Sequence, residues 1–305
     1  MARILITGAG GFIGKHLSDA LIKNGDEVYC VGLSVNNLSG RFVFMFDLRN
    51  VAEARRMIDT IKPDIIYHCA GSADVNKSVA NPEEDFEGNV QITHNLLFSV
   101  KELKMECKVI FLSSAAVYGN TLKLPIAEDA ERNPLSPYAL HKAICEDICF
   151  YMIQNYNMDI RIARVFSAYG EGLKKQLLWD MYNKVVDFGE LELFGTGEET
   201  RDYIYIDDLC QALILIANSD LDAGHIFNVA NGEEISIKYV AELFAESVKL
   251  PVKRLFFNNI FKEGNPKNWC ADTERLIKLG YKSSVTIEDG VKRYCEWLCR
   301  IQGKG

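Results

Sequence analysis

A glycine-rich turn near the amino terminus constrains the fold of this chain more than any other feature. The apolar run 4–6 leads into Thr-Gly-Ala-Gly-Gly-Phe-Ile-Gly, with glycines at positions 8, 11 and 14. An amphipathic pattern with helical spacing follows over residues 12–23. A strand, a glycine turn and a helix in this order are typical of a unit that binds the pyrophosphate of a dinucleotide.

Each glycine has a separate physical task in such a turn. Gly8 lets the backbone turn sharply, Gly11 leaves room for a pyrophosphate, and Gly14 lets the helix pack closely. The free N–H groups and the positive dipole end at the start of the helix favour phosphate. An ordinary tight turn is the alternative, because a glycine triplet alone is a weak signal. The position of the turn after the first strand favours dinucleotide binding.

Composition restricts the classes of function. The 305 residues are 48% hydrophobic and 25% charged, which is typical of a globular protein with a large core. A net charge of −8 argues against partners such as nucleic acid and anionic membranes. We expect no signal peptide and no membrane span, because every apolar run is short. The nine cysteines include no Cys-x-x-Cys pair, which predicts reduced thiols and a cytoplasmic location.

A metal site is considered at one helix face. His141, Cys145 and Cys149 follow one another at intervals of four residues. Buried cysteines on an apolar helix face are far more common than a ligand set of this kind. We therefore predict no metal.

Strand and helix patterns alternate over the first half of the chain. Strands are expected at 4–7, 28–31, 42–46, 65–69, 109–113 and 160–165, and helices at 12–23, 51–61, 83–104 and 138–156. Pro82 and Pro137 lie at two of the helix starts. Alternation with near-continuous apolar strands predicts an α/β fold of the Rossmann type, a doubly wound parallel sheet.

The pattern loosens after residue 165. A helix over 207–218 and a strand over 225–230 follow, and then helices near 236–248 and 286–300. We therefore expect a dinucleotide-binding domain made of residues 1–165 and 207–231. Residues 166–206 and 232–305 are expected to form a smaller α/β C-terminal substrate domain.

Two further motifs carry acid–base chemistry. Tyr138 and Lys142 are four residues apart, so they share one helix face. An ammonium group there stabilises a phenolate and lowers the pKa of the phenol, which makes Tyr138 a candidate acid/base. Ser114 ends an apolar strand, so it is expected at the same edge of the sheet as the glycine turn. Taken alone, a tyrosine and a lysine at this spacing are more often surface side chains, and a serine at a strand end is often a helix cap or part of a turn.

Together, these three elements resemble the extended short-chain dehydrogenase/reductase family, in its nucleotide-sugar epimerase, dehydratase and reductase branch. The resemblance spans nearly the whole chain, and it includes Asp47-Leu48, His68-Cys69-Ala70-Gly71, Asn89 and Arg201-Asp202-Tyr203. It implies catalytic roles for Ser114, Tyr138 and Lys142. It implies cofactor contacts from Gly8, Gly11, Phe12, Ile13, Gly14, Ser34, Asp47, Leu48, Cys69, Ala70, Asn89, Tyr138, Lys142 and Val165. Substrate contacts are implied for Ser114, Ala115, Tyr138, Ser167, Arg201 and Lys262.

The resemblance also implies a reaction on a nucleoside-diphosphate sugar. Tyr138 would take the proton of the C4 hydroxyl while hydride passes to the nicotinamide. Ser114 would bind the same oxygen, and Lys142 would hold the nicotinamide ribose. Arg201 would grip the phosphates of the substrate, and the alternative for this side chain is an ion pair with Asp202 or Asp207.

Departures from the family pattern narrow the reaction. Dehydratases typically have Asp-Glu after the catalytic hydroxyl, whereas this chain has Ala115 and Ala116. Two alanines cannot supply the acid and base that eliminate water, so we set dehydration aside. A C4 epimerase is the first prediction and an NADPH-dependent 4-ketoreductase the alternative. From another class, the chain would be a catalytically silent dinucleotide-binding regulator.

The cofactor stays open between NAD and NADP. The carboxylate expected at the end of the second strand, which binds the adenosine ribose, is replaced by Gly32. Without it, nothing repels a 2′-phosphate, and side chains such as Ser34, Asn36, Asn37 or Arg41 are candidates to bind one.

Two positions that the resemblance assigns to substrate binding also differ from the family pattern. Ser167 stands where the family usually has Asn, and Lys262-Glu263-Gly264-Asn265 stands where it has Arg-x-Gly-Asp. Both changes leave the nucleotide open, because lysine lacks the bidentate fork of arginine.

A homodimer is also expected, through helices 83–104 and 138–156. The resemblance implies it, and the two helices carry more apolar positions than one buried face needs. These positions are Phe86, Val90, Leu97, Ile144, Ile148 and Tyr151.

Overall fold

Seven parallel strands form the central sheet of the chain, in the order β11-β6-β5-β4-β1-β2-β3. The computed structural model describes residues 2–34, 42–121, 123–260 and 267–302. The strands are β1 (Arg3–Thr7), β2 (Glu27–Gly32), β3 (Phe42–Met45), β4 (Ile65–His68), β5 (Lys108–Ser114), β6 (Asp159–Val165) and β11 (Ile226–Val229). The predicted parallel α/β fold is confirmed, with strand ends within two residues of those expected.

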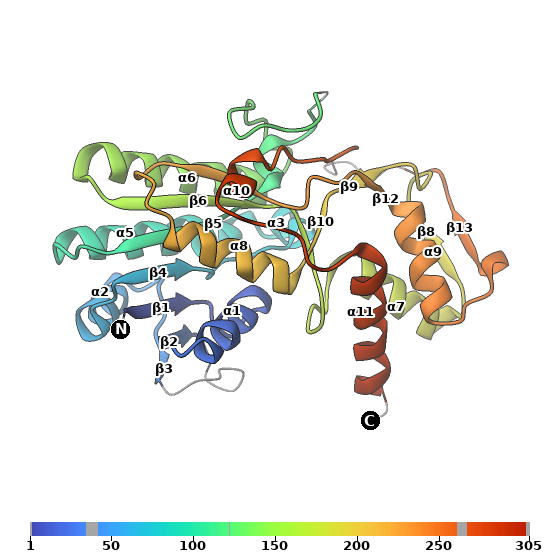
Figure 1. Cartoon of the computed structure of the whole chain (residues 1–305), viewed down its shortest axis with the longest axis horizontal. Coiled ribbons are helices and arrows are strands. Elements are labelled where there is room, and N and C mark those ends of the chain that lie inside the picture. The colour runs from blue at the N-terminus through green and yellow to red at the C-terminus, as the bar shows by residue number, and fades with distance from the viewer. Residues whose placement is uncertain (1, 35–41, 122, 261–266, 303–305) are drawn as a thin grey trace.

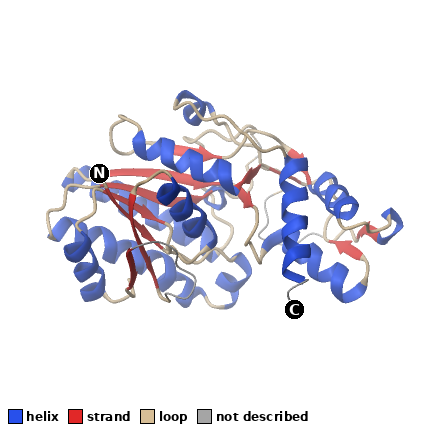
Figure 2. Cartoon of the chain, turned by 60° about the horizontal axis from the view of Figure 1, so that its bottom comes forward, coloured by secondary structure: helices blue, strands red, loops and turns tan. Residues whose placement is uncertain are grey.

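Helices cover both faces of this sheet (Figure 2). On one face, α1 (Phe12–Lys23) packs against α8 (Ile206–Asn218). The other face carries α2 (Val51–Ile61), α5 (Ile92–Glu102) and α6 (Pro137–Tyr156). Successive residues of β1 enter different cores, because side chains alternate across a strand: Ile4 and Ile6 join the first core and Leu5 the second.

The strand order reverses at β1. Connections lead from β1 outward to β2 and β3, and then back across to β4 on the other side of β1. Thr7 and His68 are register partners at the carboxyl ends of β1 and β4. Parallel sheets bind their ligands in the crevice at such a switch point. The fold therefore puts the glycine turn, which follows β1, at the ligand-binding edge.

The late elements gather at the end of the molecule away from the amino terminus (Figure 1). Their helices are α7 (Gln176–Phe188), α9 (Ile237–Ser247) and α11 (Ile287–Gln302), whereas α10 (Glu274–Lys278) contacts β11 of the central sheet. Short strands pair there: β7 (Ser167–Tyr169) with β10 (Tyr203–Tyr205), β8 (Leu191–Leu193) with β13 (Leu255–Phe257), and β9 (Thr200–Arg201) with β12 (Ile235–Ser236). Buried side chains of α7, α9 and α11 continue the core on the α1–α8 face.

One expected helix is interrupted. Residues 83–104 form α4 (Pro82–Phe86), a π-helical turn over Glu87–Gln91, and then α5. Two apolar positions expected at a dimer interface, Val90 and Leu97, are buried in the chain's own core. That part of the expectation is wrong, because the π turn and α5 direct these side chains toward the sheet.

Candidate active site

The glycine turn between β1 and α1 is shaped by close contacts of its backbone. Gly8 has φ +67°, and a Cβ on it would lie 2.6 Å from the backbone nitrogen of Ala70. A Cβ on Gly14 would lie 2.3 Å from the carbonyl oxygen of Gly8. A Cβ on Gly11 would meet only the Gly8 carbonyl oxygen, at 3.2 Å. The turn therefore requires glycine at 8 and 14 for the chain's own packing, and leaves space beside Gly11.

A cavity of about 420 Å³ opens over this turn. Six of the predicted cofactor residues line it, namely Gly8, Gly11, Ser34, Asp47, Leu48 and Ala70. The others do not border it: Phe12, Ile13, Gly14, Cys69, Asn89, Tyr138, Lys142 and Val165. The volume is in the range of small-molecule sites. A glycine-lined wall at a helix start fits a pyrophosphate, so the residues present fit a dinucleotide.

Asp47 and Arg49 form an ion pair in the cavity wall. The Arg49 guanidinium donates to both carboxylate oxygens of Asp47, from Nη2 at 2.6 Å and from Nε at 2.9 and 3.1 Å. These bonds lower the pKa of Asp47. Arg49 was not among the residues predicted from the sequence, although its spacing of two from Asp47 was a usable signal.

His68 lies behind the cavity, at the end of β4. Burial lowers its pKa to about 3, so the ring is neutral. Thr93 donates its hydroxyl proton to the Asn89 carbonyl, so it accepts from Nε2 of His68 at 3.2 Å. Nδ1 then accepts from Thr7 Oγ1 at 2.7 Å. The neutral ring thus joins β1 and β4 to α5.

Ser114 and Tyr138 meet at the carboxyl end of β5. Tyr138 lies in the first turn of α6, where Ser136 caps the helix and Pro137 starts it. Its backbone N–H donates to Ser78 Oγ at 3.1 Å, which fixes the start of the helix. The pKa of Tyr138 is raised to about 12, because the effect of burial is larger than the opposite effect of a hydrogen bond with Ser114. The structure therefore brings the two predicted hydroxyl groups together.

Lys142 lies one turn further along α6 and is buried. Its Nζ donates to the Leu112 carbonyl at 3.0 Å and lies 5.2 Å above the Phe111 ring. Burial lowers its pKa. The predicted lowering of the Tyr138 pKa by this ammonium is not found, because burial of the phenol raises its pKa and the nearby Asp85 raises it further.

Two further predicted substrate residues, Ser167 and Arg201, belong to the short strands β7 and β9. Arg201 donates to the carbonyl of Thr200 at 2.7 Å, and its guanidinium lies 5.6 Å from the Trp269 ring centroid. Burial lowers the pKa of Arg201. Ser167 begins β7, Ala115 is buried after Ser114, and Lys262 lies outside the described residues.

The ion-pair alternative for Arg201 is wrong. The Asp202 carboxylate accepts instead from the backbone N–H groups of Asn231, Gly232 and Ala271, at 2.9 to 3.0 Å. Asp207 pairs with Arg293 at 3.8 Å.

The helix face considered for a metal has other contacts. His141 Nδ1 bonds Asp85 at 2.6 Å, and Cys145 and Cys149 are buried in the core. Among the residues that the structure describes, no group of three metal-ligating side chains comes together. Within the same residues, none of the helices combines the length and apolar character needed to cross a membrane.

Comparisons with known proteins agree with a dinucleotide site over the glycine turn. The sequence model of the NAD-dependent epimerase/dehydratase family matches residues 4–230, from β1 to just after β11. The chain belongs to this family. It is therefore an NAD-dependent enzyme of the sugar-nucleotide type, which confirms the resemblance to the extended short-chain dehydrogenases/reductases.

Relatives match over almost the full length. A putative UDP-glucose 4-epimerase from Methanocaldococcus jannaschii is 28% identical over 97% of this chain and 98% of its own. The structure of UDP-glucose 4-epimerase from Thermotoga maritima with UDP-glucose has a TM-score of 0.90 and 26% identity, covering 98% of this chain and 99% of that one. The dTDP-glucose 4,6-dehydratase from Streptomyces venezuelae with NAD bound also gives 0.90, at 25% identity, over 99% and 98%.

Proposed function

We propose that this protein is an NAD-dependent epimerase that inverts C4 of a nucleoside-diphosphate hexose. The observation that supports this most is the contact between Ser114 and Tyr138 beside the glycine-lined cavity. Ala115 and Ala116 support epimerisation over dehydration, because neither can act as an acid or a base.

The roles of the chain's own residues follow from this proposal. Tyr138 takes the proton of the C4 hydroxyl and later returns it. Ser114 donates a hydrogen bond to the same oxygen and holds it within reach of the phenol. Lys142 would bind the ribose next to the nicotinamide. A bound nicotinamide would supply the hydride acceptor for C4 and, after the keto sugar has turned its other face, the hydride donor.

The same proposal divides the chain into two functional halves. Residues 1–165 and 207–231 bind the cofactor, in which Gly8, Gly11, Asp47 and Leu48 would face the dinucleotide. Residues 166–206 and 232–305 bind the nucleotide sugar, with Arg201 against the diphosphate. We also propose a homodimer through residues 83–104, which include most of α4 and all of α5, and residues 138–156 of α6.

A 4-ketoreductase is the second candidate. The end of β2 supports it, since Gly32, Leu33 and Ser34 line the cavity there and none carries the carboxylate that disfavours NADP.

The test compares Tyr138→Phe with the parent on UDP-glucose, UDP-N-acetylglucosamine and UDP-glucuronate. We expect a loss of turnover of 100-fold or more, typical of a lost acid/base, with unchanged affinity for NAD. Analysis of the nucleotide released on denaturing the protein separates the candidates. Retained NAD supports the epimerase, and a site that binds added NADPH and reduces a 4-keto sugar supports the reductase. Cofactor binding without turnover of any sugar nucleotide would favour the regulator.

A further inference from the structure

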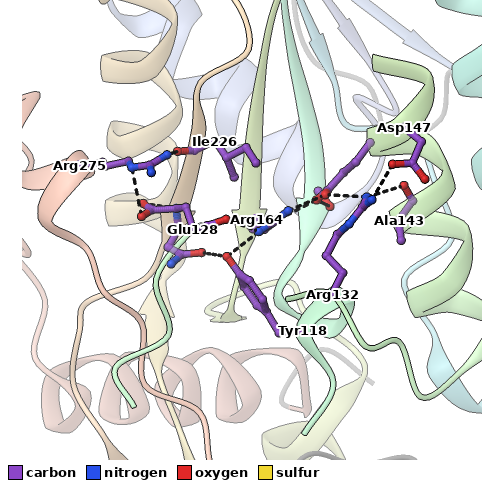
Figure 3. Close-up of polar contacts among 11 residues, drawn as sticks. Tyr118, Glu128, Arg132, Ala143, Asp147, Arg164, Ile226 and Arg275 are labelled. Carbon is purple, nitrogen blue, oxygen red and sulfur yellow. Dashed lines mark hydrogen bonds and ion pairs between the residues drawn. The ribbon is translucent and has the colours of Figure 1, made fainter. Parts of the chain in front are cut away.

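A buried ion pair lies behind the carboxyl ends of β5 and β6 (Figure 3). Arg164 of β6 donates to both oxygens of Glu146 on α6, from Nε at 2.9 Å and from Nη2 at 2.7 Å. Glu146 is 0% exposed and Arg164 is 2% exposed. Removing two charges from water costs free energy, and their attraction repays this cost only when the geometry is good and further hydrogen bonds satisfy both groups.

The pair is extended on both sides by polar side chains. Arg164 Nη1 donates to Tyr118 Oη at 2.8 Å, and Tyr118 donates to Asn228 of β11 at 2.7 Å. On the other side, Arg132 donates to Glu146 at 3.4 Å and to Asp147 at 2.6 Å (Figure 3). The network thus connects α6 with the ends of three strands and with the loop between Ser114 and Tyr138.

One bond connects this network to the candidate catalytic groups. Ser113 Oγ donates to Glu146 Oε1 at 2.6 Å, and Ser113 is the register partner of Arg164 across β5 and β6. Ser113 immediately precedes Ser114. Glu146 follows Tyr138 by eight residues, so both are on the same face of α6. The Ser113–Glu146 bond therefore fixes the strand that carries Ser114 to the helix that carries Tyr138.

We propose that Glu146, held by Arg164, is a positioning residue that sets the distance between Ser114 and Tyr138. The inference rests on the proposed role of Tyr138 as the acid/base. The hydrogen bond from Ser114 lowers the pKa of Tyr138 against the effect of burial. A small shift of β5 against α6 lengthens this bond, so the phenolate becomes harder to form.

The test uses Ser113→Ala, which removes the connecting hydroxyl and leaves the ion pair in place. Ser99→Ala is the matched control, because Ser99 is also buried and makes one hydrogen bond, to the Asn95 carbonyl of α5, outside the network. In Ser113→Ala, we expect kcat to fall about tenfold, with KM for the nucleotide sugar unchanged. The acidic limb of the kcat profile should move to higher pH. Ser99→Ala should keep the parent values.

A second measurement does not depend on turnover. Ring-labelled tyrosine gives each phenol an NMR signal, and the spectrum of Tyr138→Phe assigns the signal of Tyr138. Ser113→Ala should shift this signal and Ser99→Ala should not. A shifted signal supports the positioning role even if no nucleotide sugar is turned over, in which case only the proposed function fails. An unshifted Tyr138 signal, with parent kcat and pH profile, overturns the inference.

Glu146→Gln provides the stronger perturbation. It keeps an oxygen acceptor for Ser113 but leaves the Arg164 guanidinium without its counter-charge. We expect the same direction of change in the pH profile and in the Tyr138 signal. If this variant does not fold, Ser113→Ala still decides the question.

Discussion

Gly8 and Ala70 are in backbone contact across the switch point of the sheet, so close that a Cβ on Gly8 would lie 2.6 Å from the Ala70 nitrogen. The contact connects the turn after β1 to the residues that follow β4. Both residues line the cavity over the glycine turn. The shape of the cofactor site therefore depends on a packing contact that tolerates no side chain.

This contact separates two glycines that look equivalent in the sequence. Gly8→Ala should destabilise the fold for two reasons. The positive φ alone costs about 1–3 kcal/mol, and the methyl group would also clash with the backbone of Ala70. Gly11 has an extended backbone at φ −79°, so Gly11→Val should keep the fold and lose NAD binding. Thermal unfolding and calorimetry with NAD distinguish the two effects. Parent affinity in Gly11→Val would show that the cofactor binds elsewhere.

The buried ring of His68 predicts a loss of stability in acid. Its pKa is lowered to about 3 in the folded protein, against about 6.5 when unfolded. The unfolded chain therefore takes up the proton first, and stability falls as the pH drops from about 6.5 toward 3. The difference between the two pKa values corresponds to about 5 kcal/mol.

Urea unfolding at a series of pH values measures this effect. His68→Gln should unfold with a weaker dependence on pH over that window. The exposed His94 on α5 provides the control, so His94→Gln should keep the parent slope. Equal slopes in all three proteins would contradict the assignment of a neutral His68.

The cofactor's 2′ position gives a third prediction. The parent should discriminate weakly between NAD and NADP, since the residues at the end of β2 carry no carboxylate. Gly32→Asp should weaken NADP binding by like-charge repulsion, on the order of 1–3 kcal/mol, and leave NAD binding equal or better. Paired dissociation constants at fixed ionic strength measure this. A parent that already rejects NADP several hundred-fold would remove the main support for the reductase.

Self-association is tested on the outer face of α6. Tyr151 is 48% exposed there, and Phe86 of α4 is 44% exposed. Tyr151→Glu should convert a dimer into a monomer, because it puts a charge into the proposed interface. Phe188→Glu is the control, since Phe188 is 74% exposed and belongs to α7, a helix that lies away from α5 and α6 (Figure 1). Light scattering at micromolar concentration measures the mass, and a monomeric parent would exclude the dimer.

Local patterns were sufficient to predict most of the sheet and its helices. The helix over 12–23 has the predicted bounds, because a glycine turn and Asn24-Gly25 delimit it. The π turn over Glu87–Gln91 was not predictable, since one wide turn hardly disturbs helical periodicity. The sequence analysis also missed the paired strands of two or three residues, such as β9 with β12. They are too short to show a periodic pattern, and their partners are distant in sequence.

Some residues of the candidate site could be predicted from the sequence and others could not. Ser114, Tyr138 and the glycines stand out because each lies in a short motif. The Glu146–Arg164 pair joins a helix to a strand that follows it in the chain. In the sequence, Glu146 looks like any charged residue on a helix, so no local motif marks the pair. Only the pairing of β5 with β6 brings Ser113 and Arg164 to the same carboxylate.

The position of β11 in the chain has a consequence for synthesis. β11 covers the outer edge of β6, but it is made some 60 residues after β6 ends. A nascent chain that has emerged only as far as residue 165 therefore presents β6 as an open edge with unpaired backbone groups, which is a template for aggregation. We expect the growing polypeptide to need chaperone protection on the ribosome until residues 226–229 emerge and close the sheet.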